Sequence, residues 1–414
     1  MALSQSKWNV ACHLLDGVFF IGANIAFSVE IVIPKMISDL SNSALLLGLV
    51  PLVIQLCALL PQTFYAKKIE GLSYKKPAVL FCAFLQRAGW LAFLLSLFLG
   101  WSAAFTLPVF FAVVAVNSFG SGLITPVWTD WYAKTVPERM WGKLLGARAA
   151  VPAVLGLALG KLIQHITGVY AAPRRYQILL ILSIAFYALS FLFVMLVKED
   201  RHDGLPSHEK TSWGRYFRDL ASLLRRRDFG AFIVASVLVT VPLTVITSFL
   251  TRYGLTYPGV EAGITGRFTM FYFGAMAVGS VFGGFLSDRG NPLAPFHVFP
   301  LFTLAACVVS AASARPQVVS AAWSLLGFAW GMRITAMLPA VFRFSEPHRR
   351  AAYAAILFTA LGIGAFLPPL LGVAKDADLV TFPHVFLLSG ALAVAGWVLF
   401  LRMPAPQRAE DLRA

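Results

Sequence analysis

Six ionisable residues interrupt the long apolar runs of this sequence and are its first candidates for chemistry. They are Asp16, Glu30, Arg87, Arg148, Lys161 and Arg333. A charge inside an apolar, helix-length run is costly, so it usually faces a partner or water and marks a functional site. Arg333 is the clearest case, because the stretch "GFAWGMRITAMLP" (residues 327–339) holds no other charge. These residues predict ion pairing or proton transfer inside an apolar protein.

The apolar runs themselves indicate that lipid surrounds most of the chain. Of its 414 residues, 58% are hydrophobic and 13% are charged, whereas soluble proteins carry roughly 25% charged residues. A helix needs about 20 mostly apolar residues to span a bilayer. We expect twelve such spans, at residues 10–34, 43–66, 78–100, 104–130, 144–166, 176–197, 229–250, 264–287, 293–314, 317–341, 352–373 and 381–402. The sequence predicts an all-α polytopic membrane protein.

Basic residues concentrate in alternate loops, as in "KKIEGLSYKK" (residues 67–76) against "GWSAA" (residues 100–104). By the positive-inside rule both termini are then cytoplasmic. The net charge of +15 comes mostly from the basic residues of cytoplasmic loops, which set the orientation of the chain. No nucleic-acid partner is therefore expected. We predict a six-helix half (1–197), a cytoplasmic linker (198–228), a second six-helix half (229–402) and a cytoplasmic tail (403–414). The linker has the pattern of an amphipathic surface helix, although a plain tether explains it equally well.

The six-linker-six layout resembles the major facilitator superfamily, and one loop carries a motif that supports the resemblance. The loop "GGFLSDRGNP" (residues 283–292) is similar to the family pattern G-x-L-x-D-R-x-G-R-R. Four positions match, namely Gly284, Leu286, Asp288 and Arg289, whereas the later Gly and basic pair are absent. The equivalent loop of the first half has Ala66 where the acid is expected. The resemblance implies two halves around a central cavity lined by spans one, four, seven and ten.

The same resemblance implies a cytoplasmic gate made of ion pairs. In the second half, Glu346 would face Arg289, beside Asp288. In the first half, Asp130 would face Lys67 or Lys68. The alternative is that these charges only fix the topology of the chain.

Depth in the membrane suggests a central pair. At about 1.5 Å per residue, Asp16 lies roughly 7 Å and Arg333 roughly 6 Å to the cytoplasmic side of the middle of their spans. The resemblance places both spans on the cavity, so we expect Asp16 and Arg333 to pair across the halves. Arg87 is a competing partner for Asp16 or a structural ion. Trp330 is positioned to stack on Arg333. There are two alternatives for Arg333. It either belongs to a buried structural ion pair, or its side chain extends (snorkels) to the lipid headgroups.

Three further residues are weaker candidates for this site. Glu30, near the outer mouth of span one, is either a second proton site or an interfacial charge. Asn24 and Asn117 either bind the substrate or bond to their own helix backbone.

These features together predict a secondary active transporter that works by alternating access. We expect a small organic substrate, and the positive charge of Arg333 favours an anionic or zwitterionic one. We also expect transport to be coupled to protons. The alternatives are a drug/proton antiporter-type exporter, a uniporter and a non-transporting sensor with the same fold. Span five keeps Gly156 and Gly160 but lacks the Gly-Pro dipeptide of the drug antiporters.

An enzyme is not expected, because the chain contains neither an HExxH motif nor a GxxxxGK[ST] phosphate loop. We expect no cofactor and no metal. The short loops and the lack of an N-x-[ST] sequence fit a bacterial inner membrane, where the protein is expected to be a monomer in the lipid bilayer.

Overall fold

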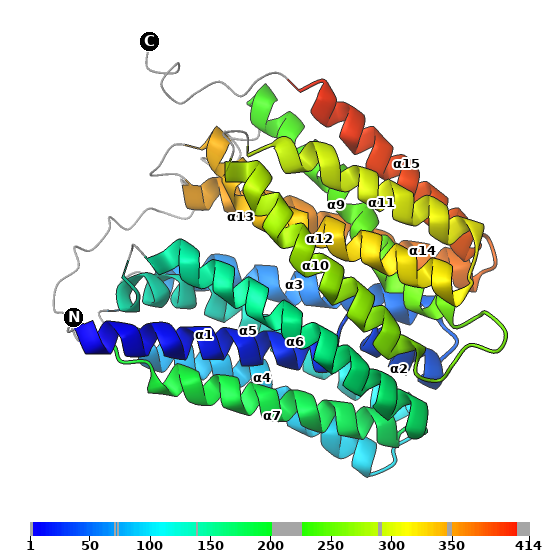
Figure 1. The fold of residues 1–414 in the computed structure, drawn as a ribbon, viewed down its shortest axis with the longest axis horizontal. Coiled ribbons are helices and arrows are strands. Elements are labelled where there is room, and N and C mark those ends of the chain that lie inside the picture. Colours follow the sequence, from blue (N-terminus) through cyan, green and yellow to red (C-terminus); the bar gives the residue numbers. More distant parts are fainter. Residues whose placement is uncertain are drawn as a thin grey trace. The chain divides into compact units, whose positions relative to one another are not determined.

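A computed structural model shows a protein built from helices (Figure 1). It describes residues 3–69, 72, 74–137, 140–200, 226–288, 292–345 and 350–403, and these contain no strand. The predicted all-α fold is confirmed. The predicted amphipathic helix of the linker falls largely on residues 201–225, which lie outside the described residues, as do residues 404–414 of the predicted tail.

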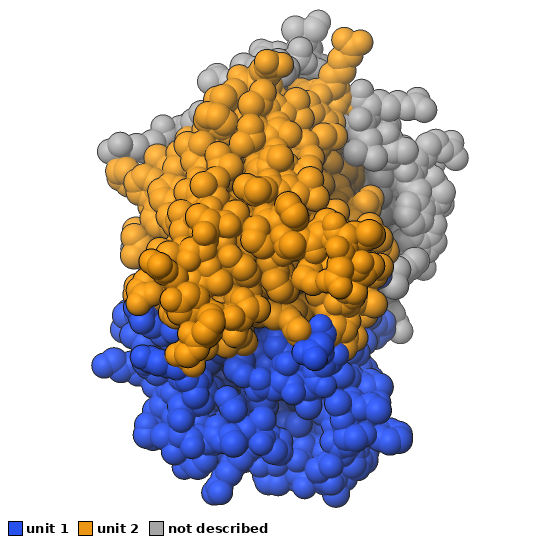
Figure 2. All heavy atoms as spheres, turned by 90° about the vertical axis from the view of Figure 1, so that its right-hand side faces the viewer, with its two compact units in different colours: residues 1–42, 50–208, 261–270 blue, residues 43–49, 209–260, 271–414 orange. Residues whose placement is uncertain are grey.

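The chain divides into two compact units, which Figure 2 colours blue and orange. Unit 1 comprises residues 1–42, 50–208 and 261–270. Within it, α1 packs against α6 and α7, and α4 packs against α5 and α7. Side chains from α4, α6 and α7 can therefore meet near the middle of α1. The helices of unit 1 are α1 (Leu3–Ala26), α2 (Val32–Leu40), α4 (Lys76–Phe98), α5 (Ala103–Thr135), α6 (Trp141–Val169), α7 (Arg174–Leu196) and most of α3 (Ala44–Ile69).

Unit 2 comprises residues 43–49, 209–260 and 271–414. Its core holds a group of aromatic rings in which Phe232 lies 5.7 Å from Phe296, 4.7 Å from Phe344 and 6.1 Å from Phe400, between ring centroids. These buried rings join α9, α11, α12 and α15. The helices of unit 2 are α9 (Arg227–Gly254), most of α10 (Ile264–Asp288), α11 (Ala294–Ala312), α12 (Pro316–Phe344), α13 (Arg350–Gly364), α14 (Leu367–Asp376) and α15 (Phe382–Leu401).

Helix α3 begins in unit 2, where Asp376 of α14 caps its first turn. The Asp376 carboxylate accepts hydrogen bonds from Ser43 Oγ and the backbone N–H of Ala44, both at 2.6 Å, and from the N–H of Leu45 at 3.0 Å. A carboxylate here satisfies donors that lack a partner inside the helix and complements the positive end of its dipole. Close packing accompanies the cap, since a Cβ atom on Gly372 would lie 2.7 Å from the Ala44 carbonyl oxygen.

Ten helices in the described part of the chain are long and apolar enough to cross a membrane. Two shorter apolar helices, Ala44–Leu59 and Val154–Val169, overlap the second and fifth predicted spans. Two other predicted spans are each divided. Span 10–34 is broken at residues 27–31 before α2, and span 352–373 is broken between α13 and α14. A proline lies just after each break, and Pro34 and Pro368 each lack the N–H that a continuous helix would use there.

Gly279 and Gly283 of α10, four residues apart, lie at close contacts with α12, as small residues of membrane helices often do. A Cβ atom on Gly279 would lie 2.1 Å from the Phe328 carbonyl oxygen, and one on Gly283 would lie 2.7 Å from Met332 Cα. Side chains at these positions of α10 would therefore push α12 away.

Candidate functional site

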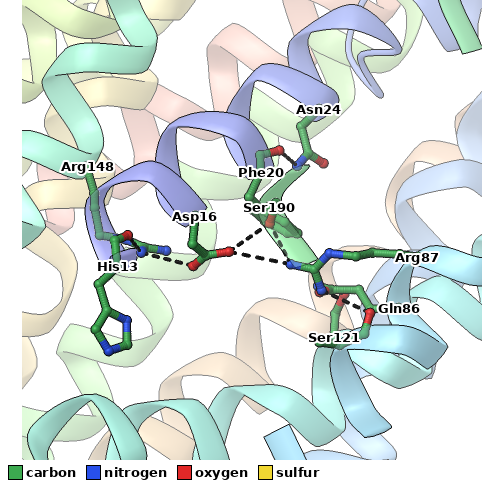
Figure 3. Close-up of polar contacts among 10 residues, drawn as sticks. His13, Asp16, Phe20, Asn24, Gln86, Arg87, Ser121, Arg148 and Ser190 are labelled. Atoms are coloured by element: carbon green, nitrogen blue, oxygen red, sulfur yellow. Dashed lines mark hydrogen bonds and ion pairs between the residues drawn. The ribbon is translucent and has the colours of Figure 1, made fainter. Parts of the chain in front are cut away.

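Asp16 lies near the middle of α1 and is 3% exposed. Figure 3 shows its carboxylate between side chains from three other helices. Arg148 of α6 places Nη1 3.1 Å from Oδ2, and Ser190 of α7 donates its hydroxyl to Oδ1 at 2.7 Å. Arg87 of α4 places Nη2 3.7 Å from Oδ1. A buried carboxylate is tolerated only with such partners, so this group is the candidate site of unit 1.

Arg87 is held from several sides and is 9% exposed. Its Nη1 donates to the Ala83 carbonyl at 2.9 Å and to Gln86 Oε1 at 3.0 Å, and its Nη2 donates to Ser190 Oγ at 2.9 Å. The guanidinium also lies 5.1 Å from the centre of the Phe20 ring. Ser190 accepts from Arg87 and donates to Asp16, so its hydroxyl bridges the cation and the anion.

A second layer of hydrogen bonds fixes Gln86 and thereby Arg87. Gln86 Nε2 donates to Ser121 Oγ at 2.8 Å, and the Ser121 hydroxyl donates to the Asn117 carbonyl at 3.0 Å. The Asn117 side chain donates to the Gln86 carbonyl. These contacts join α4 to α5. Such outer partners hold a functional side chain in one orientation.

Arg148 reaches Asp16 across the surface of α1. Its Nη1 also donates to the His13 carbonyl, and its guanidinium carbon lies 4.9 Å from the centre of the Trp128 ring. The residue after Asp16 is Gly17, and a Cβ atom there would lie 2.7 Å from Arg148 Cζ. Glycine at this position therefore leaves room for the guanidinium.

His13 is a packed histidine in this structure. Its Nε2 and Thr135 Oγ1 are 2.9 Å apart, and its ring lies 5.0 Å from that of Trp131. We call Asp16 and its partners Arg87, Arg148 and Ser190 the Asp16 cluster. Its ionic members are Asp16 and the two arginines. Among the described residues, Asp16 is the only carboxylate that pairs with either arginine.

The sequence analysis predicted a pair between Asp16 and Arg333, with Arg87 as the competing partner. In unit 1, Asp16 pairs with Arg87 and also with Arg148, which the sequence marked as a membrane charge without giving it a partner. Both Asp16 and Arg148 fall on the cytoplasmic side of their spans, and that shared depth was the available signal. Arg333 belongs to unit 2, and its pairing with Asp16 stays a prediction.

Arg333 stacks on Trp330 within α12, as its spacing in the sequence predicts. The guanidinium carbon lies 4.5 Å from the centre of the indole ring. Such a contact stabilises a cation that is removed from water. The Arg333 Nε atom is buried and has no hydrogen-bond partner in the described part of the chain.

The weaker candidates have protein contacts of their own. Asn24 donates to the Phe20 carbonyl at 2.7 Å and accepts from the Tyr187 hydroxyl at 3.2 Å. Asn117 supports Gln86, as described above. Glu30 lies in the break between α1 and α2, not in a spanning helix.

One of the predicted gate residues has a described partner. Asp130 Oδ2 lies 2.7 Å from Lys75 Nζ, whereas the sequence analysis expected Lys67 or Lys68. Those two lysines belong to α3 and Asp288 ends α10, but their side chains lie outside the described residues. Arg289 and Glu346 also lie outside the described residues.

Glu199 is a buried carboxylate that the sequence analysis did not single out. It accepts hydrogen bonds from the backbone N–H of Lys75 at 3.0 Å and of Lys76 at 2.7 Å, at the start of α4. Its other contact is an ion pair with Lys134 at 2.9 Å. This residue ties the end of α7 to α4 and α5. Its position directly after a predicted span gave no hint of these long-range partners.

No group of three or more His, Cys, Asp or Glu side chains in the described ranges could hold a metal ion. The candidate site therefore consists of ion pairs and hydrogen bonds. This chemistry suits binding of a charged group and exchange of a proton.

The family model for the Major Facilitator Superfamily matches residues 15–369. No curated protein sequence matches the chain. Three similar solved structures are transporters. The nucleoside transporter NupG is 14% identical, with a TM-score of 0.70 over 95% of this chain and 99% of that chain. A D-xylose-proton symporter is 15% identical, with a TM-score of 0.67 over 97% and 98%. A bacterial homologue of the human lysosomal transporter Spinster is 15% identical, with a TM-score of 0.68 over 98% and 100%.

Proposed function

Because the chain belongs to the Major Facilitator Superfamily, we propose that it is a secondary active transporter that carries a small organic solute by alternating access. In such a transporter two halves move about a site near the middle of the bilayer. The family match and the transporter folds of the similar structures support this function. Nucleosides and D-xylose, which appear in the names of those structures, support a small organic solute as the class to test.

We propose twelve spans, both termini in the cytoplasm, and a monomer in a bacterial inner membrane. The ten long apolar helices and the two shorter ones support the number of spans. The excess of basic residues in alternate loops supports the orientation.

The buried Asp16 carboxylate is the observation that carries the proposal of proton coupling. Protonation removes the negative charge that pairs with Arg148 and Arg87. It thereby weakens ion pairs that join α1 to α6 and to α4. A proton can shift a conformational equilibrium only through contacts whose strength depends on protonation, and these contacts meet that requirement.

Other charges complete the proposal. Arg333, held against Trp330, is proposed to contact the solute from the second half of the chain, which favours an anionic or zwitterionic solute. The proposed cytoplasmic gate consists of Asp130, Asp288, Arg289, Glu346, Lys67 and Lys68. The ion pair of Asp130 with Lys75 supports a role for Asp130 in cytoplasmic contacts.

The test uses the full chain in proteoliposomes that contain a pH-sensitive dye. A panel of metabolites that includes nucleosides, sugars and organic acids is added outside, and the internal pH is followed. We expect at least one compound to drive a saturable, protein-dependent pH change. In Asp16→Asn, which keeps the shape of the side chain without its charge, solute binding should persist and the pH change should vanish.

Asp378→Asn is the matched control, because the Asp378 side chain is 91% exposed and lies outside the cluster. It should behave like the wild type. A pH change of wild-type size in Asp16→Asn would refute the coupling role of Asp16. The absence of saturable flux for every compound in the panel would contradict the transport function.

A further inference from the structure

The Asp16 cluster contains two guanidinium groups and one carboxylate. Arg87 and Arg148 share Asp16, and neither contacts a second acidic side chain in the described part of the chain. A buried cation without a counter-ion is costly in a membrane protein. Among the described residues, the cluster therefore holds one more cation than anion.

Arg148 has more hydrogen-bonding capacity to spare than Arg87, whose Nε is its one nitrogen without a partner in the described part of the chain. Within the described residues, only Nη1 of Arg148 donates to protein, to the His13 carbonyl and to Asp16. Its side chain is 14% exposed, against 9% for Arg87. The remaining Nε and Nη2 donors form the edge of a guanidinium that binds a carboxylate through two parallel hydrogen bonds. The Trp128 ring at 4.9 Å adds an apolar surface for the body of such an anion.

We propose that Arg148 binds a carboxylate of the transported solute when Asp16 is protonated, so that one proton and one organic anion bind together. The inference rests on the proposed function, because Asp16 must exchange a proton. The proton adds to the Asp16 carboxylate, the ion pair between Asp16 and Arg148 breaks, and a new ion pair forms between Arg148 and the solute. Both states contain two cations and one anion. The exchange therefore leaves the net charge of the buried cluster unchanged.

Other titratable groups surround the cluster and are rivals for the proton. His13, on α1, contacts Thr135 of α5 through its ring. Tyr132 of α5 packs against the His13 ring at 5.2 Å. Tyr187 of α7 lies 5.9 Å from the Arg87 guanidinium carbon. The carboxylate of Asp16 differs from these groups because it alone pairs with both arginines.

The test measures binding of benzoate, a carboxylate with an aromatic body, to the purified full chain in detergent. Benzamide is its neutral analogue. Affinity comes from titration calorimetry, and proton uptake comes from a pH electrode in weakly buffered solution. We expect benzoate to bind with uptake of one proton, and its affinity to fall by up to about tenfold per pH unit as Asp16 becomes ionised. Benzamide should bind at least about tenfold more weakly, because it lacks the charge.

Three variants separate the roles. Asp16→Asn mimics the protonated acid, so it should bind benzoate at least as well as the wild type, without proton uptake. Arg148→Gln should lose benzoate binding. Lys161→Gln, at an exposed position of the same helix, is the control and should bind like the wild type.

Several results would overturn the inference. They are equal binding of benzoate and benzamide, no benzoate binding at all, wild-type binding in Arg148→Gln, and proton uptake that survives in Asp16→Asn. Benzoate binding could fail although a solute still drives Asp16-dependent pH changes in proteoliposomes. That result would refute an anionic solute and would agree with proton-coupled transport of another solute. Benzoate binding at Arg148 without proton uptake would instead remove the coupling.

Discussion

Replacement of Gly17 by alanine is predicted to separate Arg148 from Asp16. A Cβ atom at Gly17 would lie 2.7 Å from both Cζ and Nε of Arg148 and 2.8 Å from its Cγ. Non-bonded carbon atoms prefer a separation of about 3.5–4.0 Å, so the guanidinium must move by about 1 Å. The distance between Arg148 Nη1 and Asp16 Oδ2 is 3.1 Å. It should rise to about 4 Å, which is too long for a hydrogen bond.

The size of the effect follows from two opposing terms. Hydrogen bonds to charged groups contribute about 1.5–3 kcal/mol to the free energy of unfolding. Alanine is favoured over glycine inside a helix by about 1 kcal/mol. We expect Gly17→Ala to lower the free energy of unfolding by about 0.5–2 kcal/mol. Gly284→Ala is the control and should be neutral or slightly stabilising, since nothing lies within 4 Å of its added Cβ.

Thermal unfolding of the purified variants, followed by tryptophan fluorescence, measures this difference. At about 2–4 °C per kcal/mol for a unit of roughly 200 residues, Gly17→Ala should lower the midpoint of unit 1 by about 1–8 °C. In an Arg148→Ala background the same change should cost nothing, because the Cγ, Nε and Cζ atoms that it displaces are gone. A Gly17→Ala protein as stable as Gly284→Ala, or an equal loss in both backgrounds, would refute the placement of Arg148 against α1.

Three further changes test separate parts of the structure. Asp376→Asn weakens the cap of α3 and should lower the free energy of unfolding by about 1 kcal/mol, whereas Asp378→Asn nearby should have no effect on the melting midpoint. Glu199→Gln removes the negative charge that pairs with Lys134 and weakens the start of α4, so a larger loss of about 2–3 kcal/mol is expected in the same melt. Arg333→Ala should abolish solute uptake into proteoliposomes, and Arg333→Lys should restore part of it if charge alone matters; unchanged uptake in Arg333→Ala would exclude Arg333 from solute contact.

The helical fold could be predicted from the sequence because hydropathy acts locally. Runs of apolar residues long enough to cross a bilayer coincide with helices of the structure. The sequence also holds a signal for the two broken spans, because Pro34 and Pro368 stand beside the breaks. The predicted spans nevertheless continue across both prolines, because they were placed by apolar composition and not by the missing N–H groups.

The partners of the buried charges could be predicted only in part. The composition of the spans identified Asp16, Arg87 and Arg148 as costly residues, and the structure brings these three together. Which cation pairs with Asp16 depends on which helices are neighbours and on the space that Gly17 leaves. Neither property is encoded in a local pattern, so depth alone favoured Arg333. Glu199 was missed for the same reason, since its partners come from the ends of α4 and α5.

The central claim is that the carboxylate held by Arg148, Arg87 and Ser190 takes up the coupling proton. Infrared difference spectroscopy tests this claim directly, because a protonated carboxyl group has its own C=O stretching band. The spectrum of the full chain in lipid is recorded between alkaline and acidic pH, for the wild type and for Asp16→Asn. The account predicts a carboxyl band that appears on acidification of the wild type and is missing in the variant. An unchanged band in Asp16→Asn would contradict it, because the proton would then reside on another group.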